Sequence, residues 1–357
     1  MMRRWRQRAR TLLAIVGALA APAALAAEPM AVRVVVVSMF EVGADSGDTP
    51  GELQLWRERF DLDTAYPLPA GHHDVLADPE RGVIAVVTGQ GTARAAATIM
   101  ALGSDPRFDL SRAYWLVAGI AGVDPAVTTV GSAVWTDWVV DGDLAYRIDA
   151  REMPEDWPTG TIPYLRREPF EPPRPEREAR VWQLNPELLA WAHALTEDIA
   201  LDETESMKRL RARYTADAHA PARGTPEVMI GANLSATSYW HGTLLNRWAR
   251  RWIDYWTDGA ARFVTSAMED SGTLQSLAYL DRAGRADLDR VLILRTGSNF
   301  TTQPADLTAA ENLARDDDGY SAYVPSLEAA YRVGSTVVSA LVADWARYRD
   351  TVPGSER

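Results

Sequence analysis

Hydrophobic residues follow two alternating patterns along the chain from about residue 32 onward. Short runs rich in β-branched residues, typical of buried strands, precede longer stretches in which apolar residues recur every three or four positions, typical of amphipathic helices. Strands are predicted at Val32–Ser38, Val83–Thr88, Tyr114–Ala118, Ser132–Val140, Val228–Gly231, Arg262–Thr265 and Arg290–Arg295. Helices are predicted at Thr92–Leu102, Glu187–Ile199, Thr204–Tyr214, Gly242–Trp256, Glu269–Arg282 and Tyr323–Tyr348. Strands that alternate with helices in this way indicate an α/β layer fold.

The first 26 residues have the pattern of a secretory signal peptide. Five arginines within residues 3–10 precede the apolar segment Thr11–Ala20, and Ala24-Leu25-Ala26 supplies the small residues of a cleavage site. The alternative is a membrane anchor, but this segment is rich in alanine and short for a spanning helix of about 20 residues. We therefore expect a secreted, periplasmic protein whose mature chain starts near Ala27 and does not span the membrane.

The composition limits the possible number of domains and the possible classes of binding partner. The chain has 357 residues, 47% hydrophobic and 24% charged, which is ordinary for a globular protein. We expect one domain over residues 27–357, with an irregular insertion rich in proline and arginine at about residues 150–180. The formal net charge of −12 argues against nucleic acid as a partner, and the lack of cysteine excludes disulfides and thiolate catalysis. His72-His73 has no third ligand at a recognisable spacing, so we predict no metal and no cofactor.

Glycines and small polar residues follow several of the predicted strands. The segments are Thr88–Thr92, Gly119–Gly122, Met268-Glu269 and Ser298-Asn299. The carboxyl ends of strands are where open α/β sheets bind ligands, so these segments are the candidate site. Two of them have a structural alternative, because a tight strand-to-helix turn explains the first and a helix cap explains Glu269.

In this order the four segments resemble motifs of the nucleoside phosphorylase and nucleosidase superfamily, and within it the purine nucleoside permease family. The resemblance covers about residues 32–345, and Val37–Glu41 together with the tryptophan-rich middle points to the permease family. It implies a phosphorylase-like three-layer α/β/α domain with a central mixed sheet.

The resemblance also implies roles for particular residues. Met268 would pack against a ribose, Glu269 would accept hydrogen bonds from its two vicinal hydroxyls, and Asn299 would contact the purine without being able to protonate it. Glu41 is similar to a glutamate that activates water in nucleosidases, although a surface-loop carboxylate is the alternative. Thus the expected catalytic residues are Asn299 and Glu41, and the expected substrate-binding residues are Gly89, Gly91, Gly119, Ile120, Ala121, Gly122, Ser238, Tyr239, Met268, Glu269 and Ser298.

The chain departs from the phosphorylases where these place arginines for phosphate. Met39–Glu41 and Val117 occupy the corresponding positions, so hydrolysis is favoured over phosphorolysis unless Arg94 or Arg295 supplies the missing charge.

Three classes of function stay open: a nucleoside-binding protein associated with uptake, a nucleosidase, and a receptor or scavenger without catalytic activity. Uptake would require a membrane transport partner, because no later segment of the chain is apolar enough to span a bilayer. A stripe of Trp240, Trp248, Trp252 and Trp256 predicts packing in the core or between subunits of a homo-oligomer.

Overall fold

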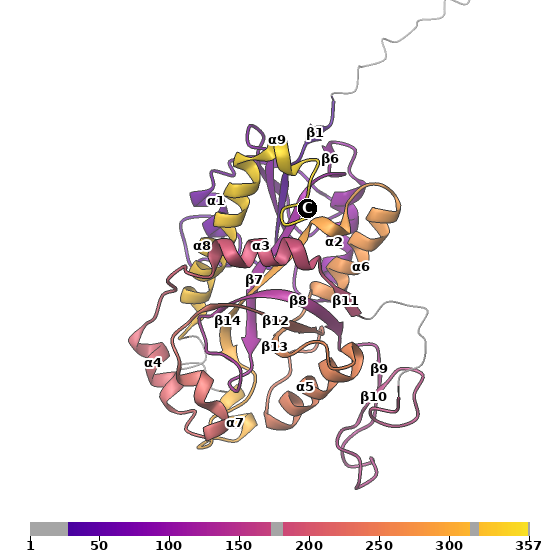
Figure 1. Ribbon diagram of the computed structural model, residues 1–357, viewed down its shortest axis with the longest axis vertical. Coiled ribbons are helices and arrows are strands. Elements are labelled where there is room, and N and C mark those ends of the chain that lie inside the picture. The colour runs from indigo at the N-terminus through magenta and orange to yellow at the C-terminus, as the bar shows by residue number, and fades with distance from the viewer. Residues whose placement is uncertain (1–27, 173–180, 315–320, 356–357) are drawn as a thin grey trace, which may run out of the picture.

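The computed structural model describes residues 28–172, 181–314 and 321–355, so the predicted signal peptide lies outside the described residues. The described chain folds into three layers, with helices on both faces of a central mixed sheet (Figure 1). This confirms the predicted α/β/α arrangement. The sheet runs in the order β11 (Val181–Gln183), β8 (Ala133–Asp141), β12 (Val228–Ser235), β13 (Phe263–Ala267), β7 (Tyr114–Val123), β2 (Val34–Ser38), β5 (Val83–Val87), β4 (Val75–Asp78) and β3 (Thr64–Tyr66), with β14 (Val291–Phe300) paired to β7 and β8.

The sheet is mixed, with parallel strands around β2 and an antiparallel pair formed by β13 and β7. Strand β2 pairs in parallel with β5 and β7, and β7 pairs in parallel with β14, so these four strands end at the same edge. Strands β3, β4 and β11 pair antiparallel with their neighbours. Two further pairs are β1 (Met30–Ala31) with β6 (Phe108–Asp109), and β9 (Ala145–Arg147) with β10 (Thr161–Pro163).

Side chains of β2 divide between two hydrophobic cores, one on each face of the sheet. Val35 and Val37 pack in the core that includes helices α2 (Thr92–Ser104) and α6 (Asp270–Arg282). Val34 and Val36 pack in the core that includes helices α1 (Gln54–Arg59), α3 (Pro186–Thr196) and α8 (Tyr323–Ala343). Because successive residues of a strand point to opposite faces, an unbroken run of valines is what a strand covered on both sides requires.

Helix α5 (Thr243–Thr257) forms a separate core with β12 and β13. Trp248 and Trp252 are 5% and 0% exposed there, so the predicted core packing of this stripe is confirmed. The remaining helices are α4 (Glu205–Ala212), α7 (Ala309–Leu313), α9 (Trp345–Tyr348) and the 3-10 turns η1 (Asp217–Arg223) and η2 (Leu288–Arg290).

Several bounds of the predicted elements were wrong. The strand expected over Arg290–Arg295 continues to Phe300, so Ser298-Asn299 lies inside β14 and does not follow it. The Gly119–Gly122 segment was expected to be a loop after a strand, but it lies inside β7, because β14 continues to pair with it as far as Phe300. The predicted helix over residues 323–348 divides at Asp344, between α8 and α9.

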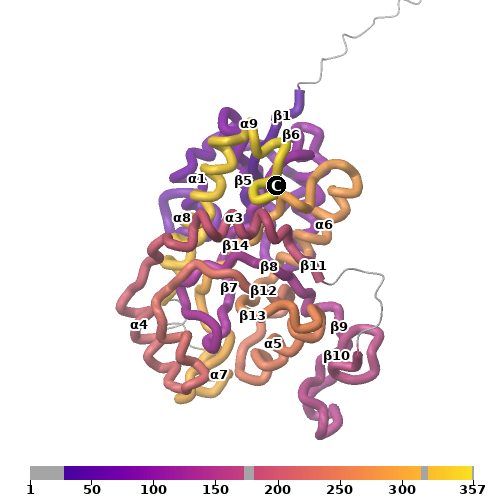
Figure 2. Tube along the Cα trace, in the orientation of Figure 1, coloured from indigo at the N-terminus to yellow at the C-terminus, as the bar shows by residue number. Residues whose placement is uncertain are grey.

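Residues 150–172 of the predicted insertion consist of turns and bends apart from β10, and residues 173–180 lie outside the described part. The β9–β10 pair extends away from the central sheet (Figure 2). In the described ranges of the chain, no helix combines the length and the hydropathy needed to cross a bilayer.

Candidate functional site

The candidate site lies where β5 and β13 end, against the second half of β7 and of β14. The turn between β5 and α2 contains two glycines with left-handed backbone, Gly89 at φ 79° and Gly91 at φ 93°. Residues with a Cβ rarely adopt such angles, which explains the glycines locally. The turn is joined to the segment after β13, because the Gly91 N–H donates to Oε1 of Glu269 at 3.0 Å and Thr92 Oγ1 donates to the Met268 carbonyl at 3.0 Å.

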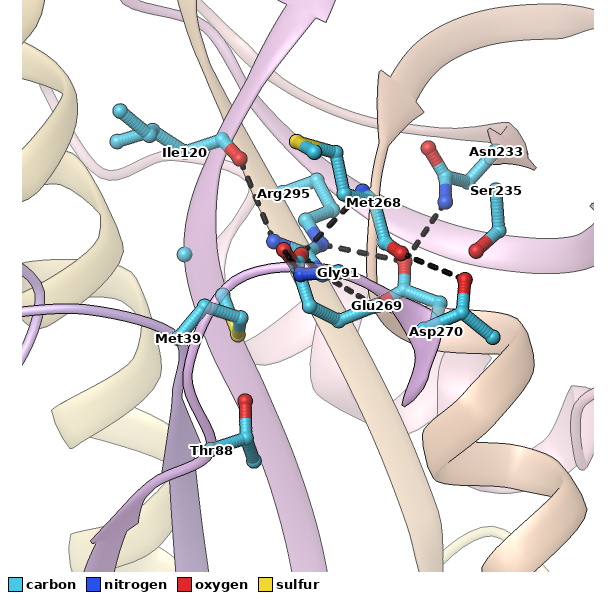
Figure 3. Close-up of polar contacts among 12 residues, drawn as sticks. Met39, Thr88, Gly91, Ile120, Asn233, Ser235, Met268, Glu269, Asp270 and Arg295 are labelled. Carbon is cyan, nitrogen blue, oxygen red and sulfur yellow. Dashed lines mark hydrogen bonds and ion pairs between the residues drawn. The ribbon is translucent and has the colours of Figure 1, made fainter. Parts of the chain in front are cut away.

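Arg295, 1% exposed, gathers the acidic side chains of this edge (Figure 3). Its guanidinium is bonded to both carboxylate oxygens of Asp270, with Nε to Oδ2 at 3.1 Å, and Nη2 also reaches Oε2 of Glu269 at 3.2 Å. Asn233 donates to Asp270 at 2.7 Å and so fixes that carboxylate from the other side. Burial opposes the charge of Arg295, but Asp270 and Glu269 outweigh it and raise the pKa of the guanidinium.

Glu269 keeps limited capacity for a ligand. Burial raises the pKa of its carboxyl, although Arg295 and the N–H groups of Gly91 and Met268 act in the opposite direction. An ionised carboxylate has about four lone-pair positions, and three N–H donors, from Gly91, Met268 and Arg295, already use it. One position therefore remains, on Oε1, so the expectation that Glu269 accepts from both vicinal hydroxyls of a ribose needs a correction to one.

Glu52, 5% exposed, is a third acid at this edge, in addition to Glu269 and Asp270. Its Oε2 accepts from the Met39 N–H and its Oε1 from the Ile120 N–H, both at 2.7 Å. Burial raises the pKa of Glu52 to about 8, and nearby Glu269 adds to this while Arg295 opposes it. A carboxyl that changes protonation near neutral pH, beside a cluster of other charges, has the properties of a general acid or base.

The structure gives Glu41 a different role from the one expected. Its Oε2 accepts from the N–H groups of Leu53 and Gln54, at 2.9 and 2.7 Å, and its Oε1 accepts from Val42 and Gly51. The carboxylate is thus bound by its own loop and by the start of α1. Glu52, and not Glu41, is the acid of this loop that contacts β7, through the Ile120 N–H.

Gly119 permits the approach of Glu52 to β7. A Cβ on this glycine would lie 2.0 Å from Met39 Cε and 2.5 Å from Glu52 Oε1. The G-x-A-G segment therefore provides bare backbone beside a carboxyl group, in addition to the Ile120 N–H that binds it.

Asn299 lies at the end of β14, four residues beyond Arg295 and thus about 13 Å further along the strand. Its Nδ2 donates to the hydroxyl of Tyr239 at 3.1 Å and to the Phe300 carbonyl at 3.3 Å, and its Oδ1 accepts from Ser298 Oγ at 3.0 Å. A Cβ at Gly122 would approach Nδ2 within 3.2 Å. The structure therefore brings Asn299, Ser298, Gly122 and Tyr239 together.

The loop after β12 carries Tyr239 and Ser238, both of which are exposed. It is held at both ends, because Thr237 Oγ1 accepts from the Thr92 N–H at 3.1 Å and the Gly242 N–H donates to the Thr301 carbonyl at 3.0 Å. The loop thus connects the start of α2 with the end of β14, which places Tyr239 beside Asn299.

Sequence interpretation missed Glu52, Asp270 and Asn233. Asp270 carried a usable signal, because a buried strand that contains Arg295 requires a buried acidic partner, and Asp270 adjoins the predicted Glu269. The sequence around Glu52 gave no comparable signal, since Glu52 lies in a loop that contains other acidic residues.

Comparison with known proteins shows the family of the chain. A model of the purine nucleoside permease family matches residues 31–353. A purine nucleoside permease of Candida albicans is 30% identical over 318 residues, covering 87% of this chain and 75% of that protein. A probable purine nucleoside permease of Schizosaccharomyces pombe is 26% identical over 334 residues, covering 88% and 90%.

Solved structures agree on the fold. A 5′-methylthioadenosine/S-adenosylhomocysteine nucleosidase from S. pneumoniae superimposes with a TM-score of 0.52 at 12% identity, covering 87% of this chain and 99% of that one. Futalosine hydrolase of Helicobacter pylori gives a TM-score of 0.51 at 12% identity, covering 87% and 98%. These likenesses confirm the phosphorylase-like α/β fold.

Proposed function

The chain belongs to the purine nucleoside permease family, and from that premise we propose that it binds purine nucleosides at the edge formed by β5, β7, β13 and β14. The observation that carries the proposal is the Arg295 cluster, in which Glu52, Glu269 and Asp270 surround one buried guanidinium beside the glycine turn. Burying such a cluster costs free energy of desolvation, and groups whose pKa values are shifted by burial and by a charged partner concentrate at functional sites.

Glu269 would bind the sugar. Its remaining lone-pair position on Oε1 suits one ribose hydroxyl, and the Gly91 N–H fixes that oxygen. The amide of Asn299 would bind the purine, because it can donate and accept at the same time. Met268, Ser238 and the Gly119–Gly122 backbone would complete the surroundings.

We further propose that the bound nucleoside is hydrolysed. Glu52 would act as the general base: in its ionised form it takes a proton from water, the water oxygen bonds to C1′ of the ribose, and the electron pair of the N-glycosidic bond leaves with the base. Asn299 would stabilise the departing base by hydrogen bonding alone, so the reaction would be slow. Non-catalytic binding is the alternative.

Phosphate is disfavoured as the nucleophile. The guanidinium of Arg295 is directed at Asp270, Glu269 and the Ile120 carbonyl, and the neighbouring carboxylates repel a dianion. Arg94 is exposed on the first turn of α2.

Export and uptake also belong to the proposal. The signal-peptide pattern of residues 1–26 supports a periplasmic, secreted protein, and the family supports an association with nucleoside uptake through a separate membrane transport partner. Self-association as a homo-oligomer is part of the same proposal. Mass spectrometry of the exported protein tests the first point, because an intact Met1 would contradict cleavage near Ala26.

The direct test is to incubate the mature protein with inosine, adenosine and guanosine, with and without phosphate, and to measure free base and ribose. We expect micromolar to submillimolar binding by calorimetry and base release that does not depend on phosphate. Ribose 1-phosphate formed at a rate that rises with phosphate would contradict hydrolysis.

A binding experiment tests the sugar contact. Glu269→Ala should weaken inosine more than hypoxanthine, because hypoxanthine has no ribose. Equal losses for the two ligands would remove Glu269 from the sugar site.

A further inference from the structure

The two ends of the candidate site differ in their charge and in their proton donors. At the Arg295 end, three carboxyl groups that are 0–5% exposed face one guanidinium that is 1% exposed. Even with one or two of these carboxyls protonated, the cluster is negative or neutral, never positive. Low-dielectric surroundings strengthen the attraction of such a cluster for a cation.

Among the residues that the structure describes, none of those bonded to Asn299 is an acid that can give up a proton at neutral pH. The groups bonded to the Asn299 side chain are the Ser298 hydroxyl, the Tyr239 phenol and the Phe300 carbonyl. Alcohols and phenols hold their protons at neutral pH, and an amide has none to transfer. The histidine nearest to Asn299 in the sequence is His241, whose Nε2 is hydrogen-bonded to Asn312. Burial lowers the pKa of this imidazole, so it is neutral at neutral pH.

We propose that the preferred substrates are purine nucleosides whose base carries a fixed positive charge, as N7-alkylated purines do. The inference rests on the proposed nucleoside-binding site and deepens it. When the bond from C1′ to such a base breaks, the electron pair neutralises the cationic ring and the base leaves without being protonated. Water supplies the new bond to C1′, and its proton passes to Glu52 and then to solvent. The reaction needs no acid at Asn299, and a buried cluster that carries no net positive charge does not repel a cationic base.

The experiment compares guanosine with 7-methylguanosine, because the two differ in the methyl group and the charge at N7. Free base is measured by chromatography, with the uncatalysed rates subtracted. General acid catalysis is worth about 10²- to 10⁴-fold, so we expect kcat/KM for 7-methylguanosine to exceed that for guanosine by at least about 100-fold. We also expect 7-methylguanosine to bind on the order of tenfold more tightly.

Asn299→Asp separates this inference from the greater intrinsic lability of the methylated substrate. A protonated carboxyl at this position can donate to N7 of guanosine, whereas 7-methylguanosine has no free lone pair there. The ratio of the two kcat/KM values should therefore fall at least about tenfold. Asn185→Asp adds the same charge at the start of α3, where either residue caps the helix, and should leave the ratio unchanged.

Equal cleavage of the two nucleosides by the native protein, or an unchanged ratio in Asn299→Asp, would overturn the inference. Binding of both nucleosides without cleavage of either would also overturn it, while leaving the proposed binding function in place. If neither nucleoside binds in calorimetry, the proposed function itself fails.

Discussion

Glu41 and Glu52 bind opposite ends of one loop. The Glu41 carboxylate accepts from the N–H groups of Leu53 and Gln54, directly after Glu52, and the Glu52 carboxylate accepts from the N–H of Met39, two residues before Glu41. The Glu52 N–H also donates a hydrogen bond to the Phe40 carbonyl at 3.0 Å, which closes the loop that connects the two acids. Glu41 thus stabilises the loop, whereas the Glu52 carboxylate contacts the backbone of β7.

This division predicts different effects of substituting the two acids. Glu41→Gln should lower the free energy of unfolding by about 1–3 kcal/mol, because it weakens several hydrogen bonds to a partly buried carboxylate. Glu52→Gln should instead suppress base release while the protein stays folded. Urea unfolding and a base-release assay measure the two effects. A Glu41→Gln protein of native stability that had lost hydrolysis would return the catalytic role to Glu41.

The pH dependence of hydrolysis should follow Glu52. Since burial raises its pKa to about 8, the ionised form that can accept a proton from water accumulates only as the pH rises through that value. We expect kcat/KM to increase as the pH rises through about 8 and to level off roughly one unit above this value, and Glu52→Gln to lack this rise. A profile that is already flat above pH 6 would exclude Glu52 as the base.

Stability should show the opposite trend with pH. The pKa of Glu52 is about 8 in the folded protein and 4.5 ordinarily, so between these values the folded state binds more protons than the unfolded state. Its contribution to stability is therefore complete below about pH 4.5 and is lost as the pH rises toward 8. Relative to Glu52→Gln, the native protein should lose on the order of 3–5 kcal/mol between pH 5 and 9. Denaturant titrations at both pH values measure this difference, and parallel curves would refute it.

Removing the main partner of Arg295 should be costly. Asp270→Asn leaves a guanidinium that is 1% exposed with a weaker counter-charge, and breaking such a buried pair costs about 3–5 kcal/mol. The matched control is Asp350→Asn, which removes an exposed partner of Arg112 and should have no measurable effect. Thermal unfolding compares the two variants, and equal melting temperatures would contradict the buried role of Asp270.

Gly119 should tolerate no side chain. Gly119→Ala places a methyl group 2.0 Å from Met39 Cε and 2.5 Å from Glu52 Oε1 in the native arrangement. Overpacking of this kind costs about 1–3 kcal/mol, and relief by moving Glu52 would lower kcat/KM. Stability and hydrolysis measured together give the result, and a variant with native values of both would show that this close approach is unimportant.

The fold could be predicted from the sequence where local pattern and tertiary packing agree. The valines of β2 fit a strand covered on both faces, and the residue pattern of α5 gave its buried side. The ends of β7 and β14 could not be predicted, because glycine and asparagine disfavour strands locally and the pairing of Asn299 with Gly122 depends on partners far apart in the chain.

The site was predictable where a polar residue lies at or just after the end of a strand, as for Glu269 after β13 and Asn299 near the end of β14. It was not predictable at Glu52, because the position of a loop carboxylate depends on what the loop packs against. Gly119 illustrates the same limit. Its motif could be recognised in the sequence, but only the structure shows that Met39 and Glu52 leave no room for a side chain at this position.

The Arg295 cluster also has a consequence for the order in which parts of the chain fold. Glu52 and Arg295 lie far apart in the sequence, so they meet only when β14 has paired with β7. Until then, a buried Glu52 would have no guanidinium nearby to offset its charge. The loop that Glu41 and Glu52 close must therefore stay hydrated, or hold Glu52 neutral, until this pairing has formed. Formation of the site is then one of the last steps of folding, so ligand binding reports on completely folded protein.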